Sequence, residues 1–268
     1  MISFNQPTTR RAALFSVAAF GASAVVLNAH PVLAEIKTEP TLDVIYVPTP
    51  QALVDRMLVM AEVKPTNFVM DLGCGDGRMV VTAAKNYGTR GYGVDINPER
   101  IDEANANAKK AGVTDKVEFE VANLFEQSMA KADVLTMYLL PEINLRLRPK
   151  ILSEMKPGSR VVSHAYNMAD WKPDGQDRVE GKEIYLWYVP AKVQGKWKVE
   201  GQTDLNFDLT QQFQTVTGTV TSNGKQSKVS VKLKGTEITL NVDGWAQPMT
   251  GRVDGKEIKG TNWRARQS

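Results

Sequence analysis

The sequence predicts an α/β fold with a parallel sheet, followed by a small antiparallel β domain. An apolar run at residues 68–70 leads through Asp71 into three glycines at alternate positions and then into a helical pattern, which indicates a strand, a tight turn and a helix. Strand-like and helix-like segments then alternate to about residue 189. From Lys192 onward the segments are short and alternate polar with apolar residues, and turns such as Asp243-Gly244 separate them.

Length and composition describe an ordinary globular chain. The 268 residues allow one large or two modest domains, and the 42% of apolar residues can fill their cores. The net charge of +3 is too small to argue for a nucleic-acid partner. The single cysteine, Cys74, excludes an internal disulfide, and no Cys/His cluster has metal-ligand spacing, so we expect no zinc or haem site.

Residues 1–34 have the pattern of a signal peptide. Arg10-Arg11 precedes an apolar run over residues 12–27, and Ala34 supplies a small residue before a cleavage site. The arginine pair after Thr9 resembles a twin-arginine leader, although Ala13 stands where such leaders have Phe. We expect an exported, periplasmic protein with no stable membrane span once the leader is cut. An uncleaved leader acting as an anchor is the alternative.

The first part of the domain shows a regular order of elements. After a linker over residues 35–42, Thr49-Pro50 predicts a helix start with Thr49 as the N-cap, and apolar residues then recur at helical spacing through Ala61. The strand near residue 69 is followed by a helix over residues 78–87 and a strand over residues 91–96. A helix capped by Asn97 then runs over residues 98–111.

The second part continues this alternation. We expect strands over residues 116–121 and 133–139, with a short helical piece over residues 124–130 between them. Pro149 should kink or break the helix predicted for residues 142–155. Two further buried strands are expected over residues 159–164 and 183–189.

The sequence of the β domain, residues 192–268, predicts six or seven short strands. They form an antiparallel meander that is either a small barrel or a curved sheet. Gly195-Lys196-Trp197 opens it, and the strands are expected over residues 204–209, 213–221, 228–234, 237–242, 249–253 and 257–263. The domain has twelve basic and seven acidic residues. It could therefore hold an anionic partner of the cell envelope, or its lysines could form an ordinary solvated face.

The glycine-rich turn has the geometry of a cofactor loop. Glycine lacks a Cβ, so a ligand can approach main-chain N–H groups at the start of the following helix. Arg78 stands where a dinucleotide fingerprint needs its third glycine, so NAD or FAD fits poorly, and no nucleotide-triphosphate loop is present. Asp95 ends the next strand, about eighteen residues past the loop, where an acid accepts hydrogen bonds from ribose hydroxyls.

Four blocks carry a resemblance to a known group of enzymes: YVPTP from Tyr46, DLGCGDGR from Asp71, YLLPEINLRLRP from Tyr138 and SHAYNMADWKPD from Ser163. Together they resemble the class I methyltransferases that act on lysines of the ATP synthase c-subunit and the adenine nucleotide translocase, with their prokaryotic relatives. The likeness covers roughly residues 43–189. It implies a Rossmann-like methyltransferase domain over residues 35–191, with S-adenosyl-L-methionine as cofactor.

The resemblance also implies roles for individual residues. Asp71, Gly73 and Gly75 would hold the methionine part of the cofactor. Asp95 would bind the ribose and Asn123 the adenine edge, although an acid is usual at the latter position. Tyr46 and Thr49 precede the first strand, where a lid over the cofactor would lie. Tyr138 and Trp171 would line the slot for the acceptor amine, whereas His164 and Cys74 are expected to be structural.

Three functions remain open at this point. An enzyme of this kind would transfer a methyl group to an amine, and the resemblance favours a protein lysine over a small molecule. Alternatively, an exported protein with a degenerate cofactor domain would bind a partner without turnover. The predicted leader favours the latter, because S-adenosylmethionine is made in the cytosol, whereas the intact glycine loop and Asp95 favour the enzyme.

Overall fold

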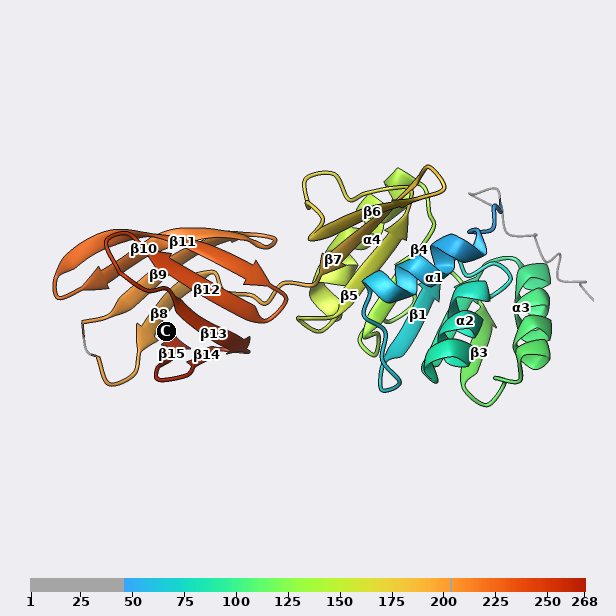
Figure 1. Ribbon diagram of the computed structural model, residues 1–268, viewed down its shortest axis with the longest axis horizontal. Helices are drawn as coiled ribbons and strands as arrows, with labels where there is room; N and C mark the ends of the chain where they lie inside the picture. Colours follow the sequence, from blue (N-terminus) through green and yellow to red (C-terminus); the bar gives the residue numbers. More distant parts are fainter. Residues whose placement is uncertain (1–45, 203) are drawn as a thin grey trace, which may run out of the picture. The chain divides into compact units, whose positions relative to one another are not determined.

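The computed structural model of the chain describes residues 46–202 and 204–268 (Figure 1). The predicted signal peptide over residues 1–34 and the linker that follows it lie outside the described residues. Within the described ranges no helix is long and apolar enough to cross a membrane.

The first part of the chain forms a seven-stranded sheet in the order β3-β2-β1-β4-β5-β7-β6. Strands β1 to β5 run parallel, whereas β7 pairs antiparallel with both β5 and β6. The order reverses between β1 and β4, which is the arrangement of a Rossmann-like fold. The strands are β1 Phe68–Leu72, β2 Arg90–Asp95, β3 Val117–Val121, β4 Val134–Met137, β5 Arg160–His164, β6 Gly175–Val179 and β7 Lys182–Tyr188.

Four helices in the described part of the chain cover this sheet, and the alternation of side chains along each strand decides which face each helix covers. Val69 packs in one core with the apolar residues of α1 (Gln51–Met60) and with Met79 of α2 (Arg78–Tyr87). The next residue, Met70, packs in a second core with α4 (Pro141–Glu154). Helices α1, α2 and α3 (Pro98–Ala111) lie along one side of the sheet in Figure 1, and α1 and α3 both contact α2.

Helix ends follow the local sequence, with one exception. The Asn97 side chain accepts a hydrogen bond from the Glu99 main-chain N–H at 2.9 Å, which confirms the predicted cap of α3. The predicted cap of α1 is wrong: Pro50 occupies the N-cap position, and the Thr49 hydroxyl bonds elsewhere. Pro149 does not break α4. The carbonyl that loses a bond to it belongs to Leu145, which is exposed, so water can satisfy that group.

Residues 124–130 form turns instead of the expected helical piece. The Asn123 side-chain oxygen accepts the Phe125 N–H at 3.0 Å, and the Asn123 carbonyl accepts the Glu126 N–H at 3.1 Å. These bonds close single turns, and the side-chain bond takes the place of a helical one. The prediction of a helix here was wrong for that reason.

The second part of the chain closes into a barrel in the order β10-β11-β12-β13-β14-β15-β8-β9. Alternate side chains point inward, with Trp197 and Phe207 fully buried among them. The expected strand over residues 257–263 is two strands, because the chain turns at Thr261-Asn262. The bounds are β8 Gly195–Val199, β9 Asn206–Gln212, β10 Thr215–Ser222, β11 Lys225–Lys234, β12 Glu237–Val242, β13 Met249–Asp254, β14 Glu257–Gly260 and β15 Arg264–Gln267.

Candidate active site

A cavity of about 550 Å³ lies where strands β1, β2 and β4 end. This is the carboxyl edge of the sheet at its switch point, the place where doubly wound folds bind ligands. Its volume is within the ordinary range for small-molecule sites. Acidic, basic and apolar residues share its walls, among them Asp71, Asp76, Asp95, Arg78, Arg100, Arg146, Ile96, Leu124, Tyr138 and Leu139.

Asp71 lines this cavity and lies near the end of β1. Its side chain is almost fully buried, and the Thr136 hydroxyl donates a hydrogen bond to it at 2.7 Å. Burial raises the pKa of Asp71 to about 8, against the opposing effect of that hydrogen bond and with help from the negative charge of Asp95. The carboxyl group is thus poised to ionise when a cation, such as an α-ammonium group, arrives beside it.

The glycine loop between β1 and α2 is held by its own hydrogen bonds. The N–H groups of Gly73 and Cys74 both donate to the Val94 carbonyl, at 2.9 and 2.8 Å. The Gly75 N–H donates to the Asp95 carboxylate at 2.9 Å, and the Gly77 N–H to the Cys74 carbonyl at 2.9 Å. These four main-chain N–H groups are therefore already used within the protein. The expectation that a ligand binds to the N–H groups of the loop is wrong for all four. The glycines instead allow a tight, left-handed path and close packing, which suits a cofactor without phosphates.

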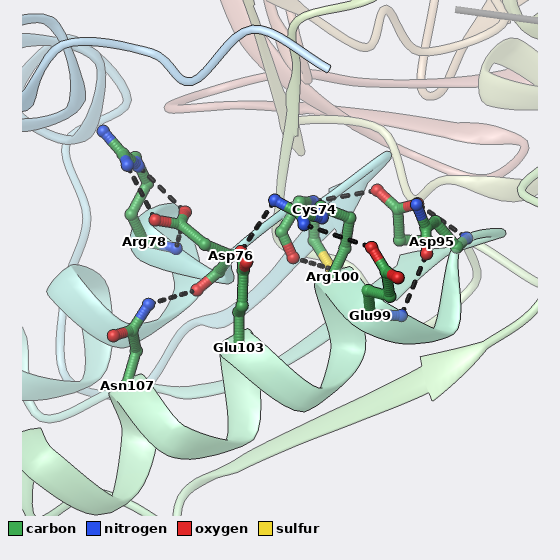
Figure 2. Close-up of polar contacts among 10 residues, drawn as sticks. Cys74, Asp76, Arg78, Asp95, Glu99, Arg100, Glu103 and Asn107 are labelled. Atoms are coloured by element: carbon green, nitrogen blue, oxygen red, sulfur yellow. Dashed lines mark hydrogen bonds and ion pairs between the residues drawn. The ribbon is translucent and has the colours of Figure 1, made fainter. Parts of the chain in front are cut away.

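Figure 2 shows how α3 and α2 fix the outer part of the loop. Arg78 binds the Asp76 carboxylate through two nitrogens, at 2.9 and 2.6 Å, and Asn107 donates to the Asp76 carbonyl at 2.9 Å. Burial opposes ionisation of Asp76, but the bonds from Arg78 prevail and lower its pKa. Arg100 is likewise paired with an acid of its own helix, Glu103, at 2.8 Å.

Asp95 joins the loop to the start of α3. One carboxylate oxygen accepts the Gly75 N–H at 2.9 Å and the other accepts the Asn97 N–H at 3.0 Å (Figure 2). Each carboxylate oxygen can accept more than one hydrogen bond, so two positions remain for ligand hydroxyls. The carboxylate lines the cavity and its orientation is fixed from both sides. This placement agrees with the ribose role that the sequence predicts.

Residues 46–49 form a strap across the cavity, with Tyr46 and Thr49 both in its lining. The Tyr46 ring lies directly on Gly75, because a Cβ at that glycine would come within 2.2 Å of the ring. Arg100 lies over the Tyr46 ring, 4.8 Å from its centroid. Arg78 donates to the Thr49 carbonyl at 2.9 Å. The strap thus lines the cavity and packs on Gly75, and its role as a lid over the cofactor stays a prediction.

Asn123 lines the cavity where the adenine was expected. Its side-chain oxygen already accepts the Phe125 N–H at 3.0 Å, and its amide nitrogen donates to Glu126 at 2.9 Å. One acceptor position on the oxygen is left for an adenine amine, without the charge that an acid would add. Ile96 and Leu124 also line the cavity and offer apolar contact for a flat base.

Tyr138 follows β4 and lines the cavity beside the strap. Its ring lies on that of His164, with the centroids 3.8 Å apart. His164 ends β5, is buried, and shares a hydrogen bond of 3.1 Å between its Nδ1 and the Thr49 hydroxyl. Burial, together with the charge of Lys182, lowers the pKa of His164 to about 4. The imidazole is therefore neutral at physiological pH and supports Tyr138 from behind.

Two predicted site residues do not line the cavity: Gly75, which lies under the Tyr46 ring, and Trp171. The Trp171 side chain is completely buried, with its ring centroid 5.9 Å from that of Trp187. The Trp187 indole N–H donates to the Trp171 carbonyl at 2.8 Å. The position in a loop after β5 suggested a functional residue, but the loop folds back into the core. Trp171 is thus placed to support the fold and not to touch an acceptor.

Several lining residues were missed from the sequence. Arg78 and Arg100 could have been predicted from the sequence. Each lies in the first turn of a helix that follows a predicted site residue. Arg146 lies over the Phe125 ring, 3.9 Å from its centroid, at the rim of the cavity. Nothing in the local pattern connects Arg146 with Phe125, because they are brought together only when α4 packs on the sheet.

Comparison with known proteins identifies the group to which this domain belongs. The ANTKMT methyltransferase domain family matches residues 71–175. A protein-lysine N-methyltransferase of Saccharolobus islandicus (strain REY15A) is 45% identical over 149 residues, which are 54% of this chain and 92% of that protein. The chain belongs to this methyltransferase family. The adenine nucleotide translocase lysine N-methyltransferase of Mus musculus is 31% identical over 150 residues, 54% of this chain and 65% of that protein.

Solved structures agree with the fold and the cofactor of this methyltransferase domain. The crystal structure of an RNA methyltransferase from Salinibacter ruber in complex with S-adenosyl-L-homocysteine matches with a TM-score of 0.54 and 46% identity, over 55% of this chain and 96% of that chain. S-adenosyl-L-methionine is the cofactor of this domain. The cavity fits it chemically, because Asp71 and Asp95 offer acceptors for an ammonium group and ribose hydroxyls, and the remaining walls are largely apolar.

Proposed function

We propose that this enzyme methylates the side-chain amine of a protein lysine. The observation that carries the proposal is the placement of Tyr138, a partly exposed aromatic side chain in the lining of the cofactor cavity, packed on a neutral, buried His164. An amine approaching the cavity would meet an aromatic face in partly desolvated surroundings. The named function of the 45%-identical relative supports the same acceptor.

The cofactor supplies, when bound, a methyl group on a positively charged sulfur. Asp71 would neutralise its ammonium group and Asp95 would fix its ribose, while the strap over Gly75 limits the access of water. The acceptor ammonium must first give a proton to water, and apolar walls favour the neutral amine. Its lone pair would then form the N–C bond as the S–C bond breaks, with S-adenosylhomocysteine as the leaving group. Alignment of the acceptor then accounts for much of the rate enhancement, so the chain needs to position the amine more than to supply a base.

An RNA acceptor is the competing reading, because the Salinibacter ruber structure is described as an RNA methyltransferase. The charges at the cavity favour a protein. Two of its three lining arginines are paired with acids, Arg78 with Asp76 and Arg100 with Glu103. A phosphate backbone would require free basic groups along its path.

Labelled methyl transfer tests the acceptor class. The purified chain is incubated with S-adenosylmethionine carrying a labelled methyl group and with total envelope protein or total RNA from its own cells. We expect label on protein, and mass spectrometry should place it on lysine. Label on RNA alone would contradict the proposal and favour the competing acceptor.

Asp95→Ala is the matched variant for that assay. It should weaken cofactor binding by roughly 2 kcal/mol, the value of charge-assisted bonds to two hydroxyls. Calorimetric titration with S-adenosylhomocysteine measures the loss directly. Because Asp95 also accepts hydrogen bonds from the Gly75 and Asn97 N–H groups, urea denaturation of Asp95→Ala serves as the control that the fold is retained. An unchanged affinity in Asp95→Ala would remove this residue from the site.

We also propose that the chain is exported and that its barrel holds an anionic partner at the envelope. The sequence of residues 1–34 supports export, and lysines on the outward side of β11 (Lys228, Lys232 and Lys234) support an anionic partner. Mass spectrometry of the N-terminus of protein from the periplasm tests the first idea; an uncut N-terminus would favour an anchor. Co-sedimentation with anionic vesicles, but not with neutral ones, tests the second.

A further inference from the structure

A second aromatic side chain, Tyr166, stands beside Tyr138 and is not part of the cavity lining. Tyr166 follows β5 as Tyr138 follows β4, and because these strands are parallel neighbours, both tyrosines lie at the same edge of the sheet. Their ring centroids are 6.4 Å apart and their planes differ by 20°. Both side chains are partly exposed, so a ligand can reach their faces.

The turn that carries Tyr166 is held in an unusual backbone conformation. Ala165 has a φ of 66°, in the left-handed region that residues with a Cβ rarely adopt. The Ala165 N–H donates to the Glu183 carbonyl at 2.8 Å, and the Tyr166 N–H donates back to the His164 carbonyl at 2.8 Å. Strained turns of this kind cluster at functional sites, where the surrounding structure maintains them.

Asn144 of α4 lies behind the same turn. It is completely buried, and its amide nitrogen lies 3.4 Å from both the Tyr166 carbonyl and the Ser163 hydroxyl. The preceding residue, Ile143, lines the cofactor cavity. A buried amide therefore fixes the main chain of Tyr166 close to the wall of the cavity.

We propose, on the basis of the function proposed above, that Tyr138 and Tyr166 form the binding site for the acceptor amine and recognise it as an alkylammonium ion. Aromatic faces attract a cation most strongly when it is partly removed from water. Tyr138 belongs to the lining of the cofactor cavity, and the partly exposed Tyr166 ring lies next to it. Tyr166 is thus a specificity-determining residue that selects a cationic side chain before the amine loses its proton.

The test uses an analogue of S-adenosylhomocysteine in which nitrogen replaces the sulfur and carries an aminopropyl arm. A second analogue with a butyl arm has the same length without the charge. Calorimetric titration of the full chain should show the aminopropyl analogue binding about tenfold more tightly than the butyl analogue. Tyr166→Leu should reduce this preference to about threefold or less, with unchanged affinity for S-adenosylhomocysteine.

Two further variants show whether the ring itself is responsible. Tyr166→Phe retains the aromatic face and should keep the preference, and Tyr87→Leu, a partly buried tyrosine of α2, should leave it unchanged. An unaltered preference in Tyr166→Leu would overturn the role of Tyr166. Equal binding of the two analogues by the unmodified chain would overturn the amine site while leaving the cofactor site intact. Failure to bind S-adenosylhomocysteine at all would refute the proposed function itself.

Discussion

Asp71 combines two properties that rarely occur together, nearly complete burial and a place in the lining of a ligand cavity. Its pKa, raised to about 8 chiefly by burial, means that the free protein holds a proton there at neutral pH. A bound ammonium group would stabilise the carboxylate and expel that proton. Binding of the cofactor is then linked to pH.

We therefore expect the affinity for S-adenosylhomocysteine to rise with pH, by about tenfold per unit between pH 5.5 and 7.5, since one proton leaves on binding. The direction follows from the raised pKa: below it, part of the binding free energy is spent in removing the proton. Calorimetry at three pH values measures the slope. Asp71→Asn has no proton to lose and should give a flat profile; a flat profile in the unmodified chain would contradict this role.

Trp171 gives the clearest difference between sequence and structure at this scale. From the sequence, Trp171→Ala should reduce methyl transfer and spare cofactor affinity. From its burial against Trp187, the substitution should instead lower the free energy of unfolding by about 3–5 kcal/mol, as for other buried large-to-small changes. Urea denaturation decides between them. Trp245→Ala, at an exposed tryptophan, is the control and should change stability by less than about 0.5 kcal/mol.

At the scale of elements, the glycine loop and α2 are determined by backbone geometry. Gly77 and Gly88 flank α2, and both have a left-handed φ, 73° and 75°. Their surroundings differ. A Cβ on Gly77 would lie 2.7 Å from the Phe119 ring and 2.8 Å from the Ala104 side chain, whereas a Cβ on Gly88 would meet nothing within 4 Å.

These two glycines form a matched pair of substitutions. Gly88→Ala should cost about 1 kcal/mol, the penalty of a left-handed alanine. Gly77→Ala should cost about 3 kcal/mol, because the same penalty is joined by a clash that pushes α2 from α3 and β3. Urea denaturation of both variants gives the comparison. Equal losses would mean that Gly77 serves only the turn and not the packing of the helix.

Most elements followed from local patterns because the local signals were strong. Helices α2 and α3 have the predicted bounds, since glycine and Asn97 define their starts and a left-handed glycine ends each. Strand β6 was missed because Gly175–Val179 is a polar edge strand, which among the described residues pairs with β7 alone. The barrel was predicted as one of two forms, and closure depends on the pairing of β8 with β15, which are far apart in sequence.

The site was predictable where it follows a strand and less so where tertiary packing creates it. Asp95 ends β2 and Asp71 is the last residue but one of β1, so the parallel sheet alone brings them to one edge. Thr49 was expected to cap a helix. Its hydroxyl instead shares a hydrogen bond with His164, which is 115 residues away in the sequence. The hydrogen bonds that the glycine loop makes within the protein could not be predicted from the local sequence either. Their acceptors, Val94 and Asp95, belong to the neighbouring strand β2.

At the scale of the whole molecule, the chain joins a methyltransferase domain to a barrel with a separate core. The match that takes in 92% of the Saccharolobus islandicus relative takes in only 54% of this chain, which leaves too little of that relative for an eight-stranded barrel. The residues that line the cofactor cavity all lie between Tyr46 and Arg146. Cofactor binding is thus a property of the first domain, and the barrel is an addition to it.

A crystal structure of the chain with S-adenosylhomocysteine tests this account most directly. The ribose hydroxyls should bond to the Asp95 carboxylate, the ammonium group should lie beside Asp71, and the sulfur should face the Tyr138 ring. The Tyr46 strap should remain closed over the ligand. A nucleoside bound elsewhere, or a cavity that stays filled by the strap when the ligand is present, would contradict the assignment.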